Sequence, residues 1–343
     1  MRIARQRLTL AAPPADPFGE RRRGRYLERR QLLGGEFLFE TDSADLLHIV
    51  RSAYAHLPGH RFSGRMPRLQ LRLVLTPPQL RPGRRAAGEP PPVRTLAGGN
   101  ILCGALSGAT LVALTPEQRR ALIVVSQELM RFPYHVRYEL LEFAVYVLAA
   151  RVQRLVPLHA ACVGRNGEGV LLMGASGAGK STLVLQCLLS GLEFLAEDSV
   201  LVRPQGLRAT GVANFLHLRP DSLRFLAAGE RSRLLRKSWP IRRRSGVEKL
   251  EIDLRRPQYR LAAAPLRIRA VVFLSRRKAG RGPLLSPMRK SAVRRRLTAT
   301  QRYAANQPGW ARFTQRIGAL PAYELRRGAH PRQAVAALGG LLV

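Results

Sequence analysis

The sequence has few lysines and few carboxylates for the number of its arginines. Lysine occurs only at positions 180, 237, 249, 278 and 290, and aspartate and glutamate together number 22 against 58 lysines and arginines. The net charge of +36 is therefore almost entirely arginine. It fits a polyanionic partner such as nucleic acid, an acidic peptide or a membrane surface. It fits equally well a compositional drift toward arginine and alanine in a GC-rich genome, because the arginines are spread over the whole chain.

Cysteine and aromatic residues are also scarce. The three cysteines, Cys103, Cys162 and Cys187, form neither a paired framework nor a C-x-x-C motif, so we expect buried thiols in a reducing compartment. Aromatic residues make up 6% of the chain, which is little for stacking on nucleic-acid bases. Zinc-finger spacing and RNA-binding signatures are missing from the sequence, which ranks a nucleic-acid-binding function below the enzyme function derived next.

Long uncharged apolar runs are absent too. The apolar part of the N-terminus, Leu8–Ala12, is too short for the core of a signal peptide. The longest apolar stretch, Leu140–Val156, carries Glu142, Arg151 and Arg154, which is typical of a core helix and not of a membrane span. We therefore expect a soluble cytoplasmic protein with no membrane span.

The motif that is present is a phosphate-binding loop. Residues 174–181 read Gly-Ala-Ser-Gly-Ala-Gly-Lys-Ser, the pattern of a P-loop, between an apolar strand at 169–173 and a helix at 181–189. Backbone N–H groups of such a loop cradle phosphates, the lysine reaches the outer phosphates and the serine hydroxyl binds Mg²⁺. ATP and Mg²⁺ are the expected cofactors. The expected binding residues are Gly174, Ala175, Ser176, Gly177, Ala178, Gly179, Lys180, Ser181 and Thr182. The alternative is a glycine-rich turn that binds nothing.

The chain divides into three predicted parts. Residues 1–34 are rich in arginine, proline and glycine and are predicted to form a loose basic arm. Residues 35–155 are predicted to form a smaller α+β domain. Its expected elements are strands at 36–40, 69–75, 100–103 and 110–114, a helix capped by Ser43, a loop at 77–97, and helices at 115–131 and 137–155. The 115–131 helix is predicted from Thr115-Pro116-Glu117-Gln118, which resembles a helix start.

Residues 156–343 are predicted to form the P-loop domain. Strands are expected at 158–163, 169–173, 194–196, 199–202 and 270–274, with a turn at 165–167. The P-loop helix should end near Gly191, helices should cover about 290–305 and the C-terminus, and residues 204–260 should be less regular. Internal repeats are missing.

Carboxylates for catalysis and metal binding have few candidates. The apolar strand 270–274 ends in Ser275-Arg276-Arg277 without an acid, which argues against transporter ATPases and motor NTPases. Glu197 and Asp198 follow the apolar residues 194–196, just past the P-loop helix. They are the predicted acids, and a solvated acidic turn is the alternative.

The order of His159, Gly174–Ser181 and Glu197–Asp198 resembles the C-terminal domain of HPr kinase/phosphorylase and the HPr-kinase-related serine kinases. The resemblance implies an α/β, mixed-sheet kinase domain of the HPr kinase/PEP carboxykinase type. It implies that Lys180 and Ser181 hold phosphates and Mg²⁺, and that one acid takes the acceptor's proton while the other joins Ser181 at the metal. Which acid does which stays open, with Asp198 favoured as essential. His159 would contact the transferred phosphoryl group, or it is structural.

This sequence departs from that family at three points. Ala160 stands where the family has glycine, Glu197 stands where HPr kinases have aspartate, and their downstream glycine-rich segment is missing. We therefore expect a substrate other than HPr and leave the reverse phosphorylase reaction open.

The predicted function is an ATP- and Mg²⁺-dependent kinase acting on a hydroxyl, a serine of a protein or peptide, with a small-molecule acceptor left open. Related kinases modify ribosomal peptide precursors, and HPr kinases form hexamers, so a homo-oligomer is possible. Arg243, Arg244 and Lys249 lie in a segment that could reach phosphates or an acidic acceptor, and the alternative for each of them is a solvated surface residue. The alternatives are a nucleotide-dependent regulatory or nucleic-acid-binding protein and an ATP-binding scaffold without activity.

Overall fold

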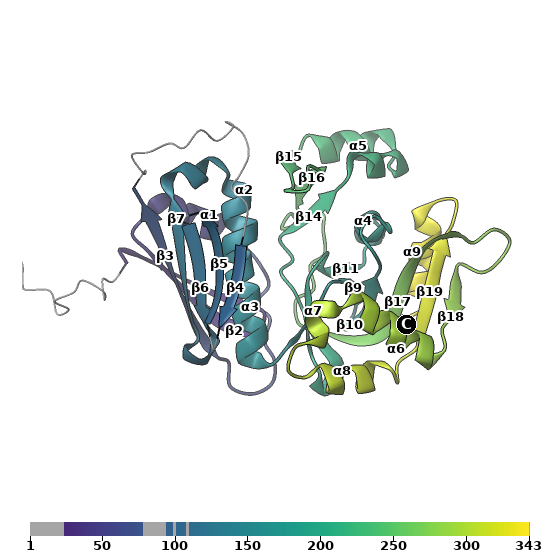
Figure 1. Ribbon diagram of the computed structural model, residues 1–343. Coiled ribbons are helices and arrows are strands. Elements are labelled where there is room, and N and C mark those ends of the chain that lie inside the picture. Colours follow the sequence, from purple (N-terminus) through teal and green to yellow (C-terminus); the bar gives the residue numbers. More distant parts are fainter. Residues whose placement is uncertain (1–23, 78–93, 99–100, 108–109, 343) are drawn as a thin grey trace, which may run out of the picture.

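The computed structural model describes residues 24–77, 94–98, 101–107 and 110–342, in which the chain forms a mixed α/β fold with three sheets. Most of the predicted basic arm (1–23) and of the predicted loop (78–93) lies outside these residues. Figure 1 shows the first sheet, built from the first part of the chain, beside the second and third sheets. Within the described residues, no helix is both long and apolar enough to cross a membrane.

The first sheet has the strand order β1-β2-β3-β7-β6-β5-β4. Its strands are β1 (Tyr26–Leu32), β2 (Gly35–Thr41), β3 (Arg68–Thr76), β4 (Arg94–Gly98), β5 (Ile101–Ser107), β6 (Thr110–Thr115) and β7 (Arg120–Ser126). The predicted strands at 36–40, 69–75, 100–103 and 110–114 are confirmed as β2, β3, β5 and β6. Helix α1 (Ala44–Tyr54) begins after Ser43, whose hydroxyl accepts a hydrogen bond from the Leu46 N–H, as predicted.

Strand β1 corrects the predicted arm. It pairs antiparallel with β2 through a tight turn at Leu33 and Gly34, whose φ angles are +50° and +82°. Its buried positions include Glu28, which binds the Arg51 guanidinium at 2.9 Å, so charged residues hid the strand from an apolar pattern. The predicted loop is likewise wrong at its end, where residues 94–97 belong to β4.

The predicted helix at 115–131 is wrong. Pro116–Gln118 forms a single 3-10 turn, Arg119 takes a left-handed conformation, and the chain then continues as β7. A second 3-10 helix, Gln127–Arg131, follows β7. The Thr115 side chain makes no cap hydrogen bond. In β7 buried Ala121, Ile123 and Val125 alternate with more exposed neighbours, a period of two that outweighs the local helix-start pattern.

Helices cover one face of the first sheet. Helix α1, the π-helix η3 (Val136–Leu141) and α3 (Glu142–Gln153) pack on it and share one apolar core with β2, β3, β6 and β7. Helix α3 confirms most of the predicted 137–155 helix. Leu201 and Val212 from the second part of the chain complete this core, so the helical face is also the face turned toward the second sheet (Figure 1).

The second sheet is mixed and has the order β11-β9-β10-β17-β13-β12-β8, with β19 beside β17 and β18 beside β19. Strands β10, β17 and β19 are parallel neighbours. The bounds are β8 (Val156–Leu158), β9 (Ala161–Arg165), β10 (Glu168–Met173), β11 (Glu193–Ala196), β12 (Val200–Arg203), β13 (Arg208–Thr210), β17 (Leu266–Lys278), β18 (Leu285–Pro287) and β19 (Ala322–Arg327). The predicted strand at 158–163 is two strands, β8 and β9, interrupted at His159 and Ala160.

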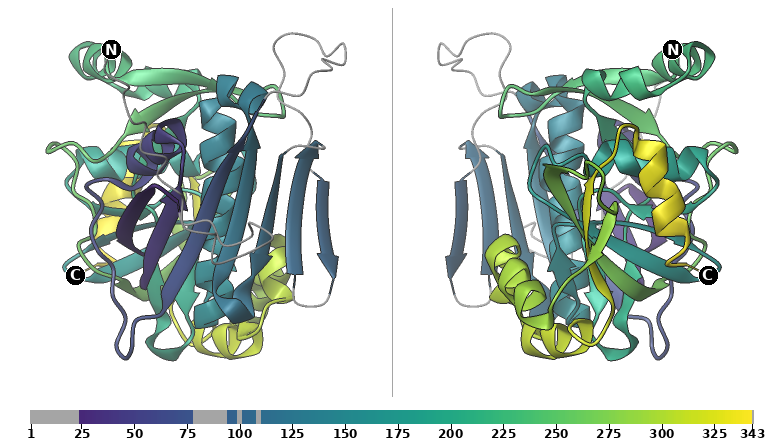
Figure 2. Two further views of the ribbon diagram at one scale, coloured as in Figure 1. Left: turned by 90° about the vertical axis from the view of Figure 1, so that its left-hand side faces the viewer. Right: turned by 90° about the vertical axis from the view of Figure 1, so that its right-hand side faces the viewer.

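Helices lie on both faces of the second sheet. Helices α4 (Lys180–Leu189) and α9 (Pro331–Gly339) share one core, and α6 (Lys290–Thr300), α7 (Arg302–Ala305) and α8 (Trp310–Ile317) share the other. Figure 2 shows α9 and the α6–α8 group on opposite sides of this sheet. The predicted helix at 290–305 is α6 and α7 with a break at Gln301, and α8 was not predicted.

Residues 204–260 are more regular than predicted. They include the third sheet, ordered β14-β16-β15, formed by β14 (Phe215–Leu218), β15 (Ser238–Arg242) and β16 (Glu248–Asp253). Helix α5 (Ala228–Leu235) precedes β15. This sheet places Glu251 of β16 and His217 of β14 opposite each other in register.

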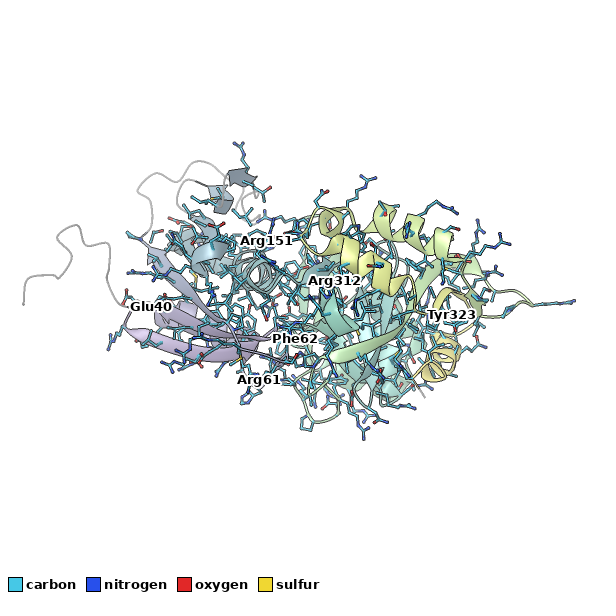
Figure 3. The ribbon with its side chains drawn as sticks, turned by 90° about the horizontal axis from the view of Figure 1, so that it is seen from below. Glu40, Arg61, Phe62, Arg151, Arg312 and Tyr323 are labelled. Atoms are coloured by element: carbon cyan, nitrogen blue, oxygen red, sulfur yellow. The ribbon has the colours of Figure 1, made fainter. Side chains whose placement is uncertain are left out.

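Polar contacts join the two parts of the chain. The buried ring of His60 lies 2.7 Å from the Thr210 hydroxyl and 2.9 Å from the Ala262 carbonyl oxygen. The Arg203 guanidinium stacks 4.2 Å from the ring of Phe62, which Figure 3 labels near the middle of the molecule. These contacts hold the two parts of the chain together.

Candidate active site

The predicted P-loop connects β10 to α4, as the motif requires. Gly177 and Gly179 have φ angles of +76° and +101°, which other residues rarely adopt. A Cβ on Gly174 would lie 3.1 Å from the Ala178 Cβ and 3.2 Å from the Leu274 Cβ, closer than such atoms usually approach. The three glycines are thus favoured for two different reasons, backbone conformation at Gly177 and Gly179 and close packing against β17 at Gly174.

Lys180 closes over the loop. Its ammonium donates a hydrogen bond of 2.7 Å to the Gly174 carbonyl oxygen and lies 3.3 Å from Nε2 of His159. Burial lowers the pKa of Lys180, although Asp198 and Glu197 act in the opposite direction. The loop lysine is therefore directed toward the two acids and the histidine that the sequence singled out.

His159 bridges Lys180 and Asp198. Its Nδ1 lies 3.2 Å from Oδ1 of Asp198. An ammonium can only donate, so Nε2 must accept from Lys180, and the ring proton then sits on Nδ1 and points to Asp198. Burial and the Lys180 charge lower the pKa of His159, with Asp198 opposing them, which favours this neutral form.

The break between β8 and β9 positions His159. The buried side chain of Gln301 accepts a hydrogen bond of 2.8 Å from the His159 N–H and donates one of 3.1 Å to its carbonyl oxygen. These two bonds replace the ladder bonds that a continuous strand would supply. The interruption of the predicted strand is therefore what turns the His159 ring to the site.

Ser181 and Glu197 form a second pair of contacts. The Ser181 hydroxyl donates to Oε1 of Glu197 at 2.5 Å, and Oε2 of Glu197 accepts the His217 backbone N–H at 2.9 Å. Hydroxyl and carboxylate oxygens are the ligands that Mg²⁺ prefers, so this donor set fits the metal that the sequence implies. Thr182, also predicted to bind the nucleotide, pairs its hydroxyl with that of Ser222 at 2.8 Å.

Four buried side chains of alternating charge extend from the site toward the first sheet, namely Glu197, His217, Glu251 and Arg137. We call this set the charge relay. The ring of His217 lies 3.3 Å from Oε2 of Glu197 and 3.0 Å from Oε2 of Glu251. Arg137, from the π-helix η3, forms an ion pair with Glu251. Sequence reasoning missed His217, Glu251 and Arg137, because only the three-dimensional arrangement brings them together.

The charge relay favours the protonated form of His217 and the ionised form of Glu197. Burial opposes charge on His217, but hydrogen bonds to Glu197 and Glu251 raise its pKa above the ordinary value. Burial alone would raise the pKa of Glu197, but bonds from His217 and Ser181 and the nearby Lys249 charge lower it to about 2. Glu197 is thus a carboxylate at neutral pH beside Ser181.

This shift predicts an acid-dependent loss of stability. Because the folded-state pKa of Glu197 lies near 2 and its ordinary value is 4.5, its contribution is present above about pH 4.5 and is lost as the pH falls toward 2. The shift corresponds to about 3 kcal/mol. Between pH 5 and pH 2.5 the wild type should therefore lose most of this contribution, about 2 kcal/mol more than the Glu197→Gln variant, as measured by urea denaturation. Equal losses in the two proteins would contradict the assignment.

The two acids occupy different surroundings. The Glu197 residue is 7% exposed, whereas the Asp198 side chain is 36% exposed beside His159. Glu197 therefore belongs to the Ser181 side of the site. Asp198 is the acid that a molecule from solution can reach.

Two arginines that sequence reasoning overlooked brace the P-loop. Arg276, at the end of β17, donates to the Ser176 carbonyl oxygen at 2.8 Å, and Arg327, at the end of β19, donates to that of Gly177 at 3.2 Å. Carboxyl ends of parallel strands meet at one edge of a sheet, which is also where the P-loop leaves β10. From the sequence alone, Ser275-Arg276-Arg277 indicates only that the strand before it ends without an acid.

The three basic residues proposed from the segment 243–249 have different surroundings. Arg244 forms a bidentate pair with Glu139 at 2.7 Å, so its charge is engaged away from the acids. Arg243 donates to the Tyr138 hydroxyl at 2.9 Å. Burial lowers the pKa of Lys249, while Glu197, acting against burial, favours its charge, which places Lys249 near the site.

Comparisons with known proteins leave the family open. The sequence matches no protein-family model and no curated protein. One solved structure similar to this chain is the Hpr(Ser) kinase/phosphatase from Coxiella burnetii, at 12% sequence identity and a TM-score of 0.26, covering 54% of this chain and 94% of that chain. A TM-score this low supports no conclusion about activity, so the functional argument rests on the site itself.

Proposed function

We propose that this protein is an ATP- and Mg²⁺-dependent kinase that transfers the γ-phosphoryl group to a hydroxyl. The observation that carries the proposal is the convergence of Lys180, His159 and Asp198, with Ser181 and Glu197 beside them. Each of these five residues was expected at such a site from the sequence. Phosphoryl transfer needs a phosphate-binding loop, a metal-binding oxygen pair and a group that takes the acceptor's proton.

In the proposed step, Asp198 accepts the proton of the acceptor hydroxyl. The acceptor oxygen forms a bond to the γ-phosphorus, and the bond from that phosphorus to the bridging oxygen breaks, so that its electron pair leaves with ADP. Neutral His159 orients Asp198 through its Nδ1–H and receives a hydrogen bond from Lys180. Lys180 would move from the Gly174 carbonyl oxygen to the phosphates when ATP binds.

Glu197 and Ser181 are assigned to Mg²⁺. When bound, the ion supplies positive charge against the phosphate oxygens. Glu197 suits this role because it is buried, ionised and fixed by His217 on its other oxygen. This assignment leaves Asp198 as the base and divides the roles that the sequence left open between the two acids.

The acceptor is proposed to be a serine of a protein or peptide. The exposure of Asp198 gives a large molecule access to the base. HPr appears in the name of the Coxiella burnetii protein, and we do not carry it over to this chain as a substrate. Glu197 and Ala160 depart from the HPr kinase pattern, which favours a different substrate here.

Lys180→Ala tests the nucleotide site. Loss of a charge-assisted hydrogen bond to phosphate costs about 1.5–3 kcal/mol, so the affinity for Mg-ATP should fall by about ten- to a hundredfold. Titration calorimetry measures this directly. Lys290→Ala removes an exposed lysine at the start of α6 and should bind as the wild type does. Equal affinity in Lys180→Ala and the wild type would contradict a phosphate role for the lysine.

A further inference from the structure

A groove of about 340 Å³ opens beside the base. Its floor includes His159 and Asp198, one wall is α3 of the first part of the chain, and the other wall is the segment 300–304 around α7. In Figure 1, α3 and α7 face each other across the junction of the two sheets. Among the described residues that line the groove, none belongs to the P-loop. The groove therefore gives access to Asp198 that is separate from the phosphate loop.

The walls are apolar and the floor is polar. Phe143, Tyr146 and Val147 line the groove at helical spacing from α3, and Tyr303 and Ala304 line it from α7. Apart from Asp198 on the floor, the charged lining residue is Arg302. Ligand sites typically have this composition, an apolar enclosure with a few polar groups that fix orientation.

The groove is held in shape by hydrogen bonds. The Tyr146 hydroxyl donates to the Ser199 carbonyl oxygen at 3.5 Å and accepts the Val212 N–H at 3.3 Å, which ties the α3 wall to the strand after Asp198. Gln301 ties the opposite wall to the backbone of His159. Both walls are thus anchored to the residues on either side of the base, and the groove exists without a ligand.

We propose that this groove binds the phosphoryl acceptor, and that the acceptor is an acidic peptide segment whose serine stands next to an aliphatic or aromatic residue. The inference rests on the kinase function proposed above and deepens it. The apolar neighbour would occupy the groove and bring the serine hydroxyl to Asp198. There the hydroxyl gives its proton to Asp198, and its oxygen displaces ADP from the γ-phosphorus.

Two observations favour a peptide over a small alcohol. Tyr303 is 57% exposed at the groove, so the apolar surface extends beyond the enclosed space, as a continuing chain requires. The chain carries a net charge of +36 and Arg302 lines the groove, so acidic residues farther along the peptide would be attracted.

The experiment offers the full chain a randomised library of serine-centred peptides with Mg-ATP and identifies the phosphopeptides by mass spectrometry. Aliphatic and aromatic residues should be enriched within two positions of the serine, and acidic residues should be enriched farther away. A panel of small apolar alcohols is offered in parallel.

Tyr303→Ala is the informative variant, because its exposed ring can be removed without opening a core. Loss of one aromatic contact should raise KM for a preferred peptide by about tenfold and leave kcat nearly unchanged. Tyr303→Phe keeps the ring and should behave as the wild type. Leu27→Ala, at another exposed apolar residue outside the groove, is the location control.

Each result decides between the claims. Three results would each overturn the groove proposal without contradicting the kinase function. They are Lys180-dependent transfer to peptides without an apolar preference, an unchanged KM in Tyr303→Ala, and transfer to alcohols alone. Absence of any transfer that depends on Lys180 would overturn the proposed function itself. Enrichment of apolar residues beside the serine that is lost in Tyr303→Ala and kept in Tyr303→Phe would support both the groove proposal and the kinase function.

Discussion

Replacing Asp198 by asparagine is expected to lower the rate of phosphoryl transfer by about two to four orders of magnitude, the usual contribution of a general base. Asparagine keeps the shape of the side chain and its contact with His159, but it cannot accept the acceptor's proton. The affinity for Mg-ATP should change little, because Asp198 is assigned to the acceptor side of the site. Steady-state kinetics with a phosphorylatable acceptor measures the transfer rate, and titration calorimetry measures the affinity for Mg-ATP.

A matched control separates this effect from a general loss of charge. Asp45→Asn changes an exposed aspartate in the first turn of α1, remote from the P-loop in sequence, and should retain full transfer. Unfolding curves of both variants should resemble that of the wild type. Full transfer by Asp198→Asn would sink the proposed mechanism and point to Glu197 as the base.

Glu251→Ala is expected to be the most destabilising single change in the charge relay. It leaves Arg137 with only its longer contact to Glu142, 3.8 Å, and leaves His217 without one of its two carboxylates, both in buried positions. Removing one partner of a buried ion pair typically costs about 3–5 kcal/mol. Chemical denaturation should show a loss of that size in the free energy of unfolding.

The control for Glu251→Ala removes the Arg137 charge as well. The double variant Glu251→Leu with Arg137→Met replaces an ion pair by apolar side chains of similar size, and it should be more stable than Glu251→Ala. Transfer should still be impaired, because His217 then holds Glu197 without its second partner. A Glu251→Ala variant as stable as the wild type would show that the charge relay contributes nothing.

Local features of the site were predictable from the sequence. The P-loop is contiguous with its strand and helix, so eight residues and their flanks determine it almost alone. Glu197 and Asp198 were found because carboxylates are rare and these two follow an apolar strand. Because carboxylates are scarce, the sequence offers few candidate acids, and these two can be identified without knowledge of tertiary contacts.

Non-local features were not predictable in the same way. Arg137 and Glu251 are 114 positions apart, and His159 and Gln301 are 142 apart. Local patterns carry no information on such pairs, so the charge relay and the two Gln301 hydrogen bonds to the His159 backbone are visible only in the fold. Strand β7 was missed for the opposite reason, because the local Thr-Pro-Glu-Gln pattern was given more weight than the alternating burial that tertiary packing imposes.

The measurement that tests the central claim most directly is phosphoryl transfer by the purified chain. Labelled Mg-ATP and a lysate of the host cell are supplied, and phosphoserine mass spectrometry identifies the products made by the wild type and by Lys180→Ala. A kinase of the proposed kind gives at least one phosphorylated product that appears with the wild type alone. ATP binding without any such product, combined with salt-sensitive binding to nucleic acid, would contradict the kinase and favour a nucleotide-dependent nucleic-acid-binding protein.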